Sequence, residues 1–138
     1  TDRCRAVYFR STDSKRHAFP NEKVFFTWFD NFDSVREVDL ETMSTYQLGK
    51  NVTYHPGTRM VKFRTVNTVY AVERNGVLRA INSEQIASEL YGELWNKNID
   101  DIEDVFFSNY KIGQQILSAS DYNVGLTIAA VESLNDNF

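Results

Sequence analysis

Four carboxylates stand close together in the second half of the chain: Asp100, Asp101, Glu103 and Asp104. Carboxylate oxygens are the ligands that Ca²⁺ prefers, so these side chains are candidate calcium ligands. The cluster lacks the alternating acidic spacing and the central glycine of an EF-hand loop. An acidic run is also typical of a solvated helix start, where negative charge interacts favourably with the helix dipole. We favour the helix start and predict no bound metal.

The chain has two histidines and one cysteine, and none stands in a metal-binding or catalytic spacing. We expect His17 and His55 each to be hydrogen-bonded or exposed to solvent. Cys4 has no partner for an internal disulfide, and next to a histidine it would be a nucleophile with its base. It lies near the start of the sequence, so we expect an inert residue or an intermolecular bridge instead. We predict no enzyme and no cofactor.

Aromatic side chains are numerous, with ten Phe and seven Tyr. Phe25 and Phe26 are adjacent, as are Phe106 and Phe107. Neighbouring residues face different ways, so we expect one ring of each pair to be exposed. Exposed rings suit sugar stacking or contact with another protein.

Composition excludes two classes of partner. The net charge is −4, and the Arg and Lys residues are scattered among acids, so we expect no nucleic-acid binding. No apolar run approaches the roughly 20 residues of a membrane span, so we expect no membrane insertion. A sequence that starts at Thr1 rather than Met is typical of a processed protein, which favours secretion.

The second half of the sequence repeats the first. At an offset of 62, Val7-Tyr8 meets Val69-Tyr70 and Glu22 meets Glu84. After a two-residue insertion the offset is 64, and Leu48-Gly49 meets Ile112-Gly113. Repeats usually build scaffolds or binding surfaces, and a catalytic constellation seldom arises twice.

Local patterns predict the elements of each repeat. In the second repeat, strands at 60–64, 69–73 and 77–81 form an antiparallel meander, with a type I′ turn at Asn75-Gly76. Ser83 is the predicted N-cap of the following helix, and a short helical turn is expected near Asp101. The first repeat predicts strands at 7–10 and 17–19, then a helix that starts near Pro20 and carries Val24 to Phe29.

One strand of this plan has no copy in the first repeat. Residues 123–128, Asn-Val-Gly-Leu-Thr-Ile, alternate apolar and polar and predict a spare strand, with Val124, Leu126 and Ile128 on one face. This strand would pair with the first repeat of its own chain, or with the next subunit by β-augmentation. Helical spacing of Val124, Ile128, Val131 and Leu134 supports a helix equally well.

Several short stretches share the pattern of a known family: 15–22, 48–58, 69–73, 76–79, 90–92, 95–96, 101–102 and 106–107. The chain resembles a tandem module of uncharacterised proteins from ultra-small, candidate-phylum bacteria, which are predicted to be secreted or surface-exposed. The resemblance covers residues 7–116. It implies an extracytoplasmic setting and carries no activity or site residue.

These observations predict an α+β fold of two tandem repeats, each an antiparallel β-meander followed by a helix, related as a pseudo-twofold pair. The repeats occupy 1–56 and 57–120, with a C-terminal segment at 121–138, packed as one unit. We expect a non-catalytic extracellular or cell-surface protein that is structural or adhesive and self-associates into a layer or filament. Val124, Leu126, Ile128 and Cys4 are the candidate assembly residues. The alternative is a carbohydrate- or cell-wall-binding module with a surface glycan as its partner.

Overall fold

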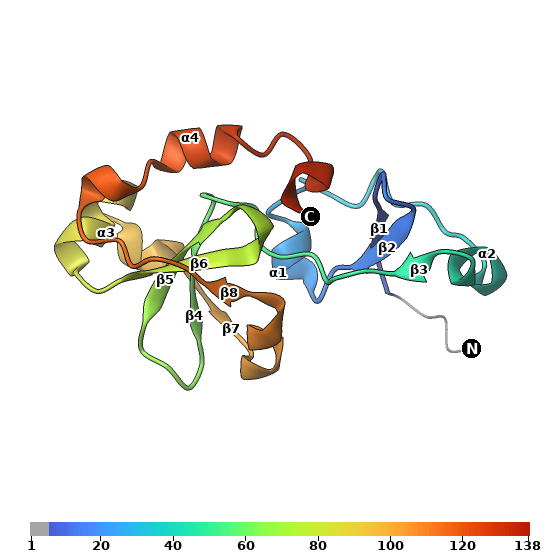
Figure 1. Ribbon diagram of the computed structural model, residues 1–138, viewed down its shortest axis with the longest axis horizontal. Helices are drawn as coiled ribbons and strands as arrows, with labels where there is room; N and C mark the ends of the chain where they lie inside the picture. The colour runs from blue at the N-terminus through green and yellow to red at the C-terminus, as the bar shows by residue number, and fades with distance from the viewer. Residues whose placement is uncertain (1–5) are drawn as a thin grey trace.

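The computed structural model describes residues 6–138, which form short helices and two mixed sheets. The predicted α+β class is confirmed. Figure 1 shows an elongated molecule with a five-stranded sheet at one end, a three-stranded sheet at the other, and helix α1 between them. Within the described residues, no helix has the length and apolar character that crossing a membrane requires.

The larger sheet contains the predicted meander. Its strands are β4 (Met60–Phe63), β5 (Val69–Glu73), β6 (Val77–Ile81), β7 (Ile99–Ile102) and β8 (Lys111–Ile112), in the order β7-β4-β5-β6-β8. Strands β4, β5 and β6 pair antiparallel, as the sequence predicts, whereas β7 and β8 add to the two edges in parallel. The helical turn expected near Asp101 is therefore wrong at that position, because Asp101 pairs with Lys62 within the sheet. A 3₁₀ helix begins only at Asp104 and ends at Asn109.

The turn and the helix of this half follow their local signals. Asn75 and Gly76 both have positive φ, 65° and 71°, which is the conformation that a type I′ turn requires. Helix α3 (Glu84–Tyr91) begins where the Ser83 side chain accepts the N–H of Ile86. It ends at Gly92, whose φ of 90° excludes a normal helical continuation.

The first half of the chain forms the smaller sheet and two short helices. It contains β1 (Tyr8–Arg10), β2 (Lys15–Ala18), α1 (Glu22–Phe25), α2 (Leu40–Ser44) and β3 (Gln47–Leu48). Helix α1 begins near Pro20 as predicted but ends at Phe25, so the predicted extension to Phe29 is wrong. After Phe25 the backbone forms a turn in which the Thr27 N–H bonds to Val24 O, three residues back. The Trp28 indole N–H donates to Thr53 O.

The offsets that relate the two sequence halves also relate two strand pairings. In the first half, β3 pairs in parallel with β2 through Lys15↔Gln47 and Arg16↔Leu48. In the second, β8 pairs in parallel with β6 through Val77↔Lys111 and Leu78↔Ile112, which are the same positions at offsets of 62 and 64. The pseudo-twofold relation of the whole halves stays a prediction.

The C-terminal segment is helical, so the strand predicted at 123–128 is wrong. Helix α4 (Val124–Ala129) begins where the Asn123 side chain accepts the N–H of Leu126. This local cap needs no partner strand, and the helical period turns Val124 and Ile128 toward the protein while Leu126 faces solvent. A 3₁₀ helix (Leu134–Asn137) follows and returns to lie near α1 and β1, as the red end of the ribbon in Figure 1 shows.

One cluster of buried side chains joins the two halves. It contains Val24 and Val52 from the first half, Val61 and Phe63 from the second, and Leu134 from the C-terminal segment. A second cluster lies between the larger sheet and α3 and includes Met60, Ala71, Ile81, Ala87, Ile116 and Tyr122.

Candidate functional site

The acidic run at 100–104 lies beside basic residues of the neighbouring strand. Strand β7 pairs with β4 so that Asp101 lies opposite Lys62. Asp101 is 3.5 Å from Lys62 Nζ, and Glu103 is 2.9 Å from Arg64 Nε. Asp104 accepts the backbone N–H and the hydroxyl of Thr65. Each of these three carboxylates thus has its own partner in the chain.

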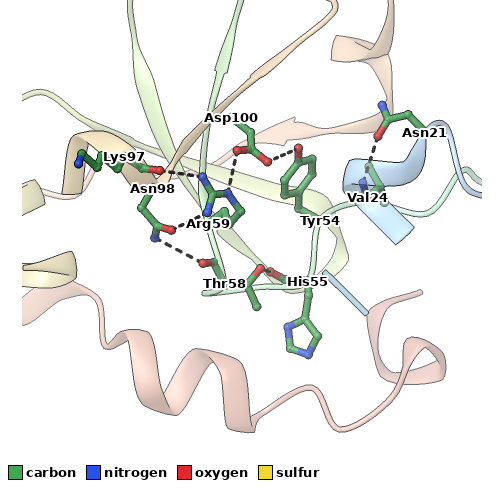
Figure 2. A network of polar contacts seen from close by, with 9 residues as sticks. All are labelled: Asn21, Val24, Tyr54, His55, Thr58, Arg59, Lys97, Asn98 and Asp100. Carbon is green, nitrogen blue, oxygen red and sulfur yellow. Dashed lines mark hydrogen bonds and ion pairs between the residues drawn. The ribbon is translucent and has the colours of Figure 1, made fainter. Parts of the chain in front are cut away.

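Asp100 is the most buried of the four acids and is the centre of the network in Figure 2. One carboxylate oxygen accepts the Nε–H of Arg59 at 2.7 Å, and the other accepts the Tyr54 hydroxyl at 2.8 Å. The remaining Arg59 nitrogens donate to Asn98 Oδ1 at 2.9 Å and to the Lys97 carbonyl at 3.0 Å. The network joins the loop after Val52 to the edge of the larger sheet.

This network is already satisfied by protein groups. Burial raises the pKa of Tyr54 well above its ordinary value near 10, and the hydrogen bond that it donates to Asp100 adds to that effect. Tyr54 therefore remains a neutral donor at physiological pH. Within residues 6–138, no group of three or more His, Cys, Asp or Glu side chains is placed to hold a metal ion. The four calcium candidates each contact protein groups along this edge of the sheet.

A cluster that sequence reasoning missed surrounds His17. Its Nε2 lies 3.0 Å from Ser11 Oγ and 3.7 Å from Asp13 Oδ1, while its Nδ1 lies 2.7 Å from the Lys50 carbonyl. The carbonyl can only accept, so Nδ1 carries a proton. The signal in the sequence was the spacing of Ser11, Asp13 and His17 around one hairpin.

The His17 cluster contains the residue types of a hydrolytic triad, but its surroundings differ from one. The imidazole is 2% exposed and stacks on the Phe138 ring at 3.7 Å between centroids. On another side it lies against Gly49, where an added Cβ would stand 2.4 Å from Cε1. In a triad the acid orients Nδ1, whereas here a backbone carbonyl does. The His17 ring is therefore covered by Phe138 and Gly49, and its two nitrogens have partners within the chain.

The other candidates are placed apart from one another. His55 Nδ1 donates to the Pro56 carbonyl at 2.9 Å, in agreement with the hydrogen-bonded role expected for it. Leu126 is 70% exposed, Val124 packs on the second buried cluster, and Ile128 lies against Gly57. The three α4 residues therefore share no single face. Cys4 lies outside the described residues.

The adjacent phenylalanines behave as predicted. Phe25 is buried and Phe26 is 45% exposed, while Phe106 is half-buried and Phe107 is 45% exposed. The exposed Phe26 ring lies beside Phe32, which it meets edge-on at 5.1 Å between centroids. Phe32 also stacks on Phe25 at 4.6 Å. This places two half-exposed rings side by side after α1.

The exposed aromatic rings continue into a longer exposed segment. Every residue from 30 to 42 is exposed, including four large apolar side chains: Phe32, Val35, Val38 and Leu40. At the offset of 64, Val38 corresponds to Ile102 of β7. Val38 is 52% exposed, whereas Ile102 is 6% exposed. The exposed segment 30–42 presents apolar groups at a position that the second half buries.

The smaller sheet also has an open edge. Its order is β1-β2-β3, so β1 is an edge strand, whereas its counterpart β5 lies inside the larger sheet. The Val7 carbonyl accepts the Phe19 N–H, and the Ser11 N–H donates to the Lys15 carbonyl, so both groups face β2. In an antiparallel pair the residues between them, Tyr8 and Arg10, point their main-chain groups to the outer side. Among residues 6–138, no strand pairs with this outer side.

A shallow hollow marks a different part of the surface, beside α3. It is lined by polar and aromatic side chains that include Asn67, Asn82, Glu84 and Trp95. An indole next to amide and carboxylate groups is the usual arrangement for stacking and hydrogen-bonding a sugar.

Comparison with known proteins adds no assignment: no family model, curated protein or solved structure matches this chain.

Proposed function

We propose that this protein is a non-catalytic, extracellular structural or adhesive protein that self-associates through its first half. The observation that carries the proposal is the exposed segment 30–42, with four large apolar side chains in contact with water. Apolar side chains grouped on a surface are typical of protein-contact sites. The open edge of β1 is a second such feature, because unpaired main-chain groups are a template for another strand.

The internal hydrogen bonding of the polar clusters supports this role. In the described part of the chain, the polar clusters around Asp100 and His17 use their donors and acceptors internally. Of the proposed assembly residues on α4, Leu126 remains available on the surface, whereas Val124 and Ile128 lie against the protein.

Light scattering across protein concentration tests the proposal, with negative-stain imaging of large species. We expect concentration-dependent assembly that the double change Val35→Ser and Val38→Ser weakens roughly tenfold or more, since each valine buries apolar area in the contact. The matched control is Leu117→Ser with Val105→Ser, because those side chains are more exposed than Val35 and Val38 but lie outside segment 30–42. A strict monomer at high concentration would contradict self-association.

The hollow beside α3 supports a second function, a carbohydrate- or cell-wall-binding module. A glycan array identifies any ligand, and Trp95→Ala should abolish its binding because the stacking surface is lost. Leu94→Ala is the control, since Leu94 is exposed next to Trp95 but does not line the hollow. Equal binding by both variants would exclude this hollow as the site.

A further inference from the structure

The second half shows how a complete unit is built around β4. This strand pairs antiparallel with β5 on one side and parallel with β7 on the other. Three of its side chains, Met60, Val61 and Phe63, are fully buried. Strand β4 is therefore the central connection between β5 and β7.

The first half contains counterparts of β5 and β7 but none of β4. Strand β1 corresponds to β5, and residues 35–38 correspond to β7. In the described residues, no strand stands on the outer side of β1, and residues 35–38 are not a strand. Without a β4 equivalent to pair with, these residues remain exposed.

The outward main-chain groups of β5 have partners, whereas no strand pairs with the corresponding groups of β1 in the described residues. Tyr70 of β5, the counterpart of Tyr8, pairs with Val61 of β4. The carbonyl of Val72, the counterpart of Arg10, accepts the Gly57 N–H at 3.1 Å. An added strand beside β1 would satisfy Tyr8 and Arg10 in the same way.

Charge defines what such a strand would carry. Glu37 and Asp39 stand at the positions of Asp101 and Glu103, whose partners are Lys62 and Arg64. Across residues 6–138, neither Glu37 nor Asp39 has a cation within ion-pair distance. Asp39 Oδ1 accepts the Thr42 N–H at 2.7 Å as the N-cap of α2, which leaves its negative charge without a cation. The two anions therefore complement basic residues spaced as Lys62 and Arg64 are.

We propose that the first sheet accepts an extended segment of another polypeptide as an added strand beside β1. The segment alternates apolar and basic residues as Met60 to Arg64 do: the apolar side chains cover Val35 and Val38, and the basic ones pair with Glu37 and Asp39. This inference rests on the proposed assembly function and names the chemistry of its partner.

A synthetic peptide with the sequence of residues 58–66 tests the proposal on the intact protein. We expect it to slow hydrogen exchange at the Tyr8 and Arg10 amides, which an added strand would bond. A control peptide in which both basic residues at the Lys62 and Arg64 positions are glutamate should bind roughly tenfold more weakly, because like charges then meet. Unchanged exchange at Tyr8 and Arg10 would overturn the proposal.

A protein variant tests the charge pairing from the other side. Glu37→Lys should weaken binding of the basic peptide and strengthen binding of its glutamate version, whereas Glu41→Lys should change the binding of neither peptide. Glu41 is also an exposed acid of this segment, and its counterpart is the uncharged Val105. Identical behaviour of the two variants would overturn the assigned partner charge.

Light scattering separates this inference from the proposed function. If the protein assembles but the peptide neither binds nor competes with assembly, the added strand is wrong and self-association stands. If the protein stays monomeric while the peptide protects β1, self-association is wrong and the strand-accepting edge stands.

Discussion

At the scale of single residues, the Tyr54 hydroxyl contributes one hydrogen bond to the Asp100 network, and its removal leaves the rest of the network in place. Tyr54→Phe removes the donor to one carboxylate oxygen and leaves that oxygen half-buried beside a ring. An unsatisfied acceptor of this kind costs about 1–3 kcal/mol. Denaturant unfolding should show this loss. Tyr70→Phe is the control, because the described structure gives the Tyr70 hydroxyl no hydrogen bond, and equal losses in both variants would contradict the role of Tyr54.

Residue-level chemistry was the part of the site that the sequence predicted least well. The acids at 100–104 are visible as a cluster, but their partners Arg59, Lys62 and Arg64 lie some 40 residues earlier. Only the parallel pairing of β7 with β4 brings them together. The acidic run therefore predicts a local negative charge, but it does not reveal which distant cations pair with it.

At the scale of elements, local signals succeeded wherever the cause of the element is local. The Asn75-Gly76 turn and the Ser83 cap depend on one or two residues, and both formed as predicted. The parallel strands β7 and β8 depend on distant partners, which a single sequence does not reveal. Residues 123–128 fit both periods, and the side-chain cap of Asn123 favoured the helix.

Substituting alanine at two glycines should change the stability of the fold in opposite directions. Gly49→Ala places a Cβ 2.4 Å from the His17 ring, which is held by Phe138, so we expect a loss of about 1–3 kcal/mol from overpacking. Gly125→Ala lies in α4 with its nearest neighbour at 3.6 Å, so better helix propensity should stabilise the fold by roughly 0.5–1 kcal/mol. Thermal unfolding measures both, and a stabilising Gly49→Ala would show that the His17 contact is loose.

At the scale of the whole molecule, the C-terminal segment connects the two hairpin turns. Asn135 Oδ1 accepts the Thr12 N–H at 2.9 Å in the first half, and Asn137 Oδ1 accepts the Asn75 N–H at 2.8 Å in the second. The sequence left open whether residues 121–138 would close on their own chain or reach another subunit. The structure shows closure, by side chains of a 3₁₀ helix and not by strand pairing.

The two asparagines should differ sharply in their contribution to this closure. Asn137 is 3% exposed and also donates to Thr53 Oγ1 at 3.1 Å. Asn137→Ala leaves the buried Thr53 hydroxyl without this donor and removes the part-buried bond from the Asn75 N–H, so it should cost about 2–4 kcal/mol. Asn135→Ala removes one bond at the exposed Thr12 and should cost under about 1 kcal/mol. Denaturant unfolding gives both values, and hydrogen exchange at Asn75 should rise only in the Asn137 variant. Equal, small losses would mean that the two hairpins are held together by the shared apolar core alone.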